Sequence, residues 1–169
     1  MNTKTPEESA FESALRLLAA GDKTCRELKN RLERKAYPAP VIETVLERLQ
    51  KKGFLNDAAF AAQLVDRLLY KSAGKKKIAF ELARRGFAGP VIAGQLERLT
   101  PETEQGSLEE AGLKQWRRYR RLDSAARQKK VFAFLARSGF ESGMIRAFLE
   151  RLAAGTGQED EASSHDDDE

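Results

Sequence analysis

The chain has 169 residues, of which 41% are hydrophobic and 33% are charged, which excludes disorder throughout and is typical of exposed helices. One cysteine, Cys25, excludes an internal disulfide framework, and the polar start MNTKTPEES lacks the apolar core of a secretory signal. No apolar run approaches the ~18 residues of a membrane span, so we expect a soluble, cytoplasmic protein with no membrane partner.

Acidic residues are concentrated at the C-terminus. The segment from Gly157 to Glu169 contains seven acidic residues and no Lys or Arg, so residues 1–156 carry 30 basic and 19 acidic groups, a net charge of +11. A basic body with an acidic tail indicates a polyanionic partner. The alternative interpretation is a soluble surface with a solvated tail.

In chain order, the first predicted element is a helix over residues 6–20. Thr24 and Glu27 then predict a capping box at the start of a second helix. Leu28 and Leu32, four residues apart, give that second helix one buried face. A third helix follows, and it starts close to proline, which is tolerated in the first turn of a helix.

The same three elements follow twice more. Helices over residues 57–71 and 107–121 open the second and third sets. Gly86 and Gly139 lie where the second helix of each set must end, which is a natural position for glycine. Ala36 takes this place in the first set.

Five apolar positions recur in the same order in all three sets. The positions of the first set recur 50 residues later, and again 53 residues after that, with no gap inside the unit. The tripeptide Glu-Arg-Leu recurs with them. The recurring positions are Leu32, Tyr37, Ile42, Leu46 and Leu49, then Leu82, Phe87, Ile92, Leu96 and Leu99, then Leu135, Phe140, Ile145, Leu149 and Leu152.

No segment shows the alternating pattern of a β-strand. We therefore predict an all-α protein with three tandem three-helix repeats, which stack into an elongated, curved array. The predicted divisions are a disordered N-terminus over residues 1–5, repeats over 6–54, 55–102 and 103–155, and a disordered acidic tail over 156–169.

The residues favour a binding protein over an enzyme. The one histidine, His165, lies in the acidic tail, and the common zinc, phosphate and dinucleotide motifs are absent. Cys25 lies at a predicted helix start, where the dipole lowers a thiol pKa, but a packed structural cysteine is favoured because no histidine is available as its base. Trp116 and Tyr119, three residues apart, fit a core better than a stacking surface. We predict no catalytic residue, metal or cofactor.

Basic residues form runs in the second and third repeats. Lys75, Lys76 and Lys77 precede a predicted helix, where backbone N–H groups already attract anions. Such runs match the charge of a phosphate backbone, although a solvated helix surface is the alternative. The predicted binding face comprises Lys75, Lys76, Lys77, Arg84, Arg85, Arg117, Arg118, Arg120, Arg121, Lys129 and Lys130.

The sequence resembles the RecX family of bacterial recombination regulators over about residues 14–152. The resemblance rests on ALRLL at 14–18 with ELKNRL at 27–32, on GFLND at 53–57 with ELARRGF at 81–87, and on residues 129–140. Ala36 departs from the glycine of the later repeats, and Asn56 replaces one residue of a usual acidic pair.

The resemblance implies three tandem three-helix units and binding to the RecA recombinase, especially to its filament on single-stranded DNA. It also implies modulation, mostly inhibition, of RecA's ATPase, recombinase and coprotease activities in DNA repair and the SOS response. A direct, sequence-independent DNA-binding module remains the alternative. We expect a monomer.

Overall fold

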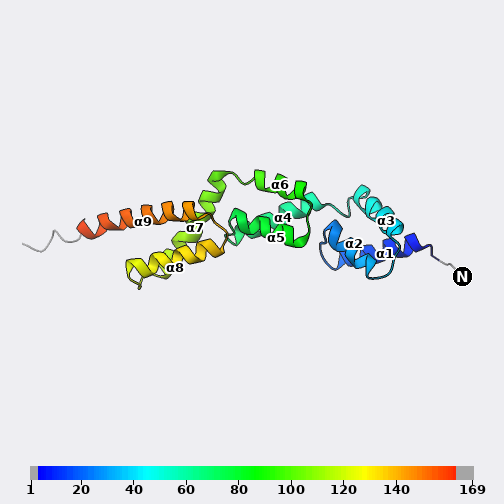
Figure 1. The fold of residues 1–169 in the computed structure, drawn as a ribbon, viewed down its shortest axis with the longest axis horizontal. Helices are drawn as coiled ribbons and strands as arrows, with labels where there is room; N and C mark the ends of the chain where they lie inside the picture. The colour runs from blue at the N-terminus through cyan, green and yellow to red at the C-terminus, as the bar shows by residue number, and fades with distance from the viewer. Residues whose placement is uncertain (1–3, 163–169) are drawn as a thin grey trace, which may run out of the picture. The chain divides into compact units, whose positions relative to one another are not determined.

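The computed structural model describes residues 4–162, with side chains as far as Ala154. This part of the chain forms nine α-helices and no strand, so the all-α prediction is confirmed (Figure 1). The helices are α1 (Pro6–Ala19), α2 (Cys25–Glu33), α3 (Ala39–Lys51), α4 (Asp57–Tyr70), α5 (Lys75–Arg85), α6 (Gly89–Glu97), α7 (Pro101–Arg118), α8 (Ser124–Arg137) and α9 (Ser142–Ala162).

Local sequence signals set most of the helix starts. The predicted capping box of α2 is confirmed, because the Thr24 hydroxyl accepts from the Glu27 N–H and the Glu27 carboxylate accepts from the Thr24 N–H. A second capping box joins Thr5 and Glu8 at α1. Thr5 belongs to the segment that the sequence assigned to the N-terminus before the first repeat.

The predicted start of the seventh helix was wrong. Residue 107 was expected to lie near that start, but α7 begins at Pro101, after the N-cap Thr100. The Thr100 hydroxyl accepts from the Thr103 N–H, and proline suits the first turn. Gly106 lies inside this stretch, and because glycine is unfavourable in a helix, the sequence did not indicate that the helix begins before it.

The chain divides into two compact units. Unit 1 comprises Met1–Arg67 with Ala79–Arg98, and unit 2 comprises Leu68–Ile78 with Leu99–Glu169. The division cuts through the second predicted repeat, and the predicted repeat boundaries remain predictions. Residues 163–169 of the predicted tail, including His165, lie outside the described residues.

Each unit has its own apolar core. In unit 1 it is formed by α1, α2 and α3 around Leu28, Leu32 and Ile42, and in unit 2 by α7, α8 and α9 around Leu108 and Leu135. Of the fifteen recurring positions, eleven are buried and four are half-buried, so the predicted core faces are confirmed. Burial of these side chains is the main stabilising contribution to both units.

Candidate partner-binding surface

The second helix of one repeat ends at the start of the second helix of the preceding repeat, and this contact occurs twice. In unit 1, the buried Thr24 hydroxyl at the start of α2 donates to the Arg85 carbonyl at the end of α5, at 3.1 Å. In unit 2, the Gly74 N–H at the start of α5 donates to the Ser138 carbonyl after α8, at 2.7 Å. We call these two contacts the helix joints. They satisfy polar groups that helix ends otherwise leave without partners.

The lysine run Lys75–Lys77 lies at the unit 2 joint. The Lys76 N–H donates to the Gly139 carbonyl at 3.2 Å, and the Lys75 N–H donates to the Glu104 carboxylate at 3.2 Å. The N–H of Lys75 thus binds an anionic side chain of the protein itself, and the binding of an external anion at this helix start remains a prediction. The side chains of Lys76 and Lys77 are exposed, and Lys75 is half-buried.

Glycine is favoured at both joints, but the atoms that an added Cβ would meet differ. A Cβ on Gly86 would lie 2.6 Å from the Arg26 Cδ, and a Cβ on Gly139 would meet the backbone nitrogen of Lys77. Gly86 and Gly139 also have positive φ values of 82° and 89°. Ala36, which is exposed, has the same left-handed conformation with φ of 60°.

The two predicted arginines of α5 are both engaged within unit 1. The Arg84 guanidinium pairs with Glu81 at 2.7 Å. Arg85 is half-buried, pairs with Glu27 at 3.3 Å, and has its guanidinium 4.8 Å from the centre of the Phe60 ring. Arg85 therefore connects α2, α4 and α5.

The predicted basic residues of the third repeat are exposed. They follow one another along the end of α7, the turn after it and α8, and within the described residues no ion pair holds any of them. Together with the lysine run, they place nine of the eleven predicted residues in unit 2. The exposed residues of the third repeat are Arg117, Arg118, Arg120, Arg121, Lys129 and Lys130.

Arg127 and Trp116 have structural roles. The Arg127 guanidinium lies 3.8 Å from the centre of the Trp116 ring, and its Nε donates to the Trp116 carbonyl at 2.9 Å. Burial lowers the pKa of Arg127 from its ordinary value. The ring of Trp116 is buried and Tyr119 is half-buried, so the core interpretation of both aromatic residues is confirmed.

Cys25 is a half-buried residue at the start of α2. Its N–H donates to the Asp57 carboxylate at 2.9 Å. Burial raises the pKa of the Cys25 thiol, and the negative charge of Asp57 raises it further. Both effects oppose the expected action of the helix dipole on the thiol pKa, so the structure favours the packed, unreactive cysteine.

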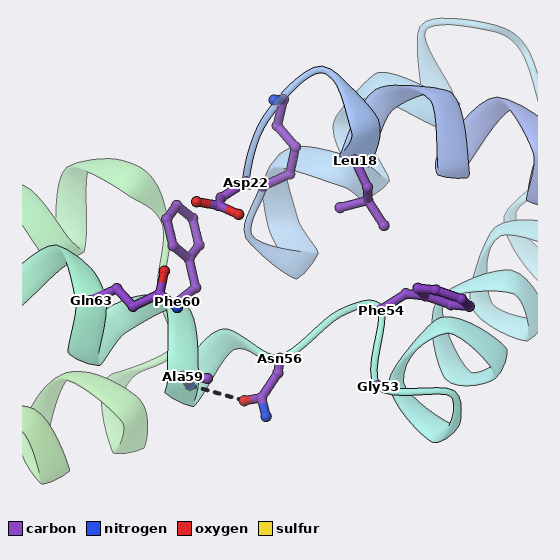
Figure 2. A pocket seen from close by; sticks show the side chains of 9 residues that line it. Leu18, Asp22, Gly53, Phe54, Asn56, Ala59, Phe60 and Gln63 are labelled. Atoms are coloured by element: carbon purple, nitrogen blue, oxygen red, sulfur yellow. Dashed lines mark hydrogen bonds between the residues drawn. The ribbon is translucent and has the colours of Figure 1, made fainter.

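A cavity of about 220 Å³ lies in unit 1, beside the segment that connects α3 and α4 (Figure 2). Its lining combines apolar groups such as Leu18 and Phe60 with charged groups such as Asp22 and Lys23. Figure 2 shows the Asn56 side chain turned to the start of α4, where it accepts from the Ala59 N–H at 2.9 Å. Asn56 thus takes the role of an N-cap.

Exposed aromatic rings are the surface feature that sequence reasoning missed. Tyr70 is 92% exposed, Phe80 63% and Phe54 57%. The sequence analysis assigned no role to these three rings, because no signal in one sequence separates an exposed ring from a buried one. In the described part of the chain, no group of metal-binding side chains is found, and no helix is long and apolar enough to cross a membrane.

Comparison with known proteins gives consistent matches. A family model of the first three-helix domain of RecX matches residues 10–49, and a model of the third matches residues 102–149. The regulatory protein RecX of Chlorobium phaeobacteroides is 32% identical over 149 residues, which cover 88% of this chain and 96% of the relative. That of Mycolicibacterium smegmatis is 34% identical over 147 residues, or 83% of this chain and 78% of the relative.

Solved structures agree on the fold. The crystal structure of RecX from Lactobacillus salivarius matches with a TM-score of 0.78 at 19% identity, covering 88% of this chain and 97% of that one. A crystal structure of another regulatory protein RecX matches with a TM-score of 0.73 at 25% identity, covering 86% and 73%.

Proposed function

Because this chain belongs to the RecX family of regulatory proteins, we propose that it binds the RecA recombinase and RecA filaments on single-stranded DNA. In this proposal the protein modulates, and mostly inhibits, the recombinase, ATPase and coprotease activities of RecA in DNA repair and the SOS response. It acts in the cytoplasm as a monomer, without a cofactor and without catalysis of its own.

The observation that carries the proposal is the set of exposed basic side chains in unit 2. Lys76, Lys77 and the six exposed basic residues of the third repeat have no ion-pair partner among the described residues. A filament on single-stranded DNA offers both protein and phosphate surfaces, and many modest contacts to a repeating target add through avidity. Arg84 and Arg85 belonged to the predicted face, but in this proposal they stabilise unit 1.

The test measures RecA's DNA-dependent ATPase activity and RecA filament length with and without the purified protein. We expect the protein to lower the ATPase rate and shorten the filaments. If both quantities stay unchanged at saturating protein, the proposal is wrong.

Replacement of Lys75, Lys76 and Lys77 by alanine localises the interface. We expect weaker filament binding with unchanged helicity, because the joint at α5 uses backbone groups that the substitutions keep. The matched control is the Lys51→Ala/Lys52→Ala variant, which removes exposed lysines from unit 1. Equal binding by the triple variant would move the interface elsewhere.

Direct, sequence-independent DNA binding is the second candidate, favoured by the same basic residues. Affinity for bare DNA, measured against salt concentration, separates the two. A steep salt dependence without any effect on RecA would favour the second candidate, because phosphate contacts alone give that behaviour.

A further inference from the structure

Tyr70 ends α4 with its side chain almost free of the protein. The residue is 92% exposed, so its ring packs on no core. One exposed ring does not make a site, because single apolar groups are common on protein surfaces. Tyr70 differs from other exposed rings in the hydrogen-bonded turn and the lysines that follow it in unit 2.

The turn after Tyr70 is held firmly by backbone hydrogen bonds. The N–H groups of Lys71 and Ala73 donate to the Leu68 carbonyl at 3.1 and 3.0 Å, and the Ser72 N–H donates to the Leu69 carbonyl at 2.7 Å. Ala73 is buried, and the next residue forms the unit 2 joint. Tyr70 therefore precedes a turn that is held by backbone hydrogen bonds and by the buried side chain of Ala73.

Cationic side chains follow Tyr70 on the same turn and on the first turn of α5. Lys71, Lys76 and Lys77 are exposed, and none of them forms an ion pair within the described residues. All three belong to unit 2, as Tyr70 does. The exposed ring is thus followed in the chain by three lysines whose side chains form no ion pair among the described residues, while the Glu104 carboxylate binds the Lys75 N–H.

We propose that Tyr70 is a stacking platform for an unpaired base, and that Lys71, Lys76 and Lys77 hold the adjoining phosphates of a single-stranded nucleic acid. A single strand offers both chemistries, since its bases expose their faces beside regularly spaced phosphates. A duplex offers the phosphates but keeps its base faces stacked. An acidic protein offers charge but no regular succession of flat rings.

This site would supply the contact with the single strand in the proposed function, on which the assignment rests. Stacking of this kind tolerates any base, since every base has a flat aromatic face. The expected binding is therefore independent of sequence but dependent on the strand being unpaired.

The test measures binding of a fluorescent oligothymidine by anisotropy, with no RecA present. We expect Tyr70→Ala to weaken binding about 5- to 150-fold, and Tyr70→Phe, which keeps the ring, to bind within about 2-fold of the unchanged protein. Phe54→Ala is the matched control, because it removes an exposed ring that follows Lys51 and Lys52 in the sequence of unit 1, and it should leave affinity unchanged.

Two further measurements identify the contacts. For the Lys76→Ala/Lys77→Ala variant, the logarithm of the affinity for the single strand should depend less steeply on the logarithm of the salt concentration. The slope should fall by about 1.4, because each of the two lost phosphate contacts contributes about 0.7. Photo-crosslinking of an oligonucleotide that contains 5-iodouracil should label Tyr70, as read by mass spectrometry. A duplex of the same length should bind Tyr70→Ala and the unchanged protein equally.

Several outcomes would overturn the inference. They are no binding of the single strand by the unchanged protein, full affinity of Tyr70→Ala, and an equal loss on single strand and duplex. Loss of RecA binding by Tyr70→Ala without loss of oligonucleotide binding would assign the ring to a protein partner instead. A protein that binds the oligonucleotide through Tyr70 but leaves RecA's ATPase unchanged would contradict the proposed function and leave this inference standing.

Discussion

The guanidinium of Arg85 lies 3.3 Å from the carboxylate of Glu27, although 58 residues separate them in the chain. Both side chains are less than a third exposed. The same guanidinium stands over the ring of Phe60. One arginine thus links three helices of unit 1 at the point where α5 meets α2.

Removing this arginine should destabilise unit 1. We expect Arg85→Gln to lower the free energy of unfolding by about 1 kcal/mol, through the partly buried ion pair and the cation–π contact. A double-mutant cycle of Arg85→Gln with Glu27→Gln, measured by urea denaturation, gives the interaction free energy between the two side chains. Arg84→Gln breaks a more exposed pair with Glu81 and should cost less than about 0.5 kcal/mol. Equal effects of the two arginine substitutions would contradict the assigned role.

Replacement of Ala36 by glycine should stabilise the protein. Its φ of 60° lies in the left-handed region, which is unfavourable for a residue with a Cβ. We expect Ala36→Gly to raise the free energy of unfolding by about 1 kcal/mol, after the larger entropy of the unfolded glycine is allowed for. The control Ala83→Gly, at an exposed site inside α5, should lower stability by about 1 kcal/mol. A destabilised Ala36→Gly protein would show that the alanine methyl group makes a compensating contact.

The two joint glycines should differ in their tolerance of alanine. At Gly86 the added Cβ meets the flexible side chain of Arg26, which can move. At Gly139 it meets the backbone of Lys77, which cannot move without disturbing the start of α5. We expect Gly86→Ala to cost about 1–2 kcal/mol and Gly139→Ala more than about 2 kcal/mol. Hydrogen exchange at the Gly74 and Lys76 amides reports the second joint directly, and unchanged protection in Gly139→Ala would contradict the described contact.

Cys25 should react slowly with iodoacetamide near neutral pH. Because the raised pKa of the thiol keeps it protonated, its alkylation rate should rise only at a higher pH than that of the unfolded chain. Asp57→Asn keeps an oxygen acceptor for the Cys25 N–H but removes the negative charge. The pH–rate profile of that variant should therefore shift to lower pH, whereas Asp66→Asn, at an exposed site of α4, should not shift it. An identical profile for Asp57→Asn would leave burial as the sole cause.

Deletion of the residues after Gly157 should strengthen non-specific DNA binding. The deletion removes seven acidic groups, which compete with phosphate for the basic residues. The control keeps the length of the tail but replaces each acid by its amide. Both variants should bind DNA more tightly at low salt, and the difference from the unchanged protein should shrink as salt is added. Unchanged or weaker binding by both would exclude such competition.

The core faces followed from the sequence because one apolar set occurs three times at helical spacing. The joints did not follow, because the hydrogen bonds from Gly74 and Lys76 join residues more than sixty positions apart. The partners of the Lys75 and Lys76 N–H groups, the Glu104 carboxylate and the Gly139 carbonyl, are likewise too distant in sequence to be recognised. Arg85 was assigned to a binding face as one of the basic residues of α5, and its partner Glu27 was missed because it is 58 residues away in the chain. Solvent exposure of Tyr70 likewise depends on what the neighbouring helices leave uncovered.

The helix joints also distinguish the third copy from the two before it. Each joint needs a helix start that is open to receive a carbonyl, as at Thr24 and Gly74. The matching position in the third copy is Arg127, but α8 starts earlier, at Ser124, and Arg127 is held on Trp116. The start of α8 thus has an additional turn, and an arginine packed on Trp116, where the two earlier copies have a joint. The three copies share their apolar core positions but differ at the start of their second helix.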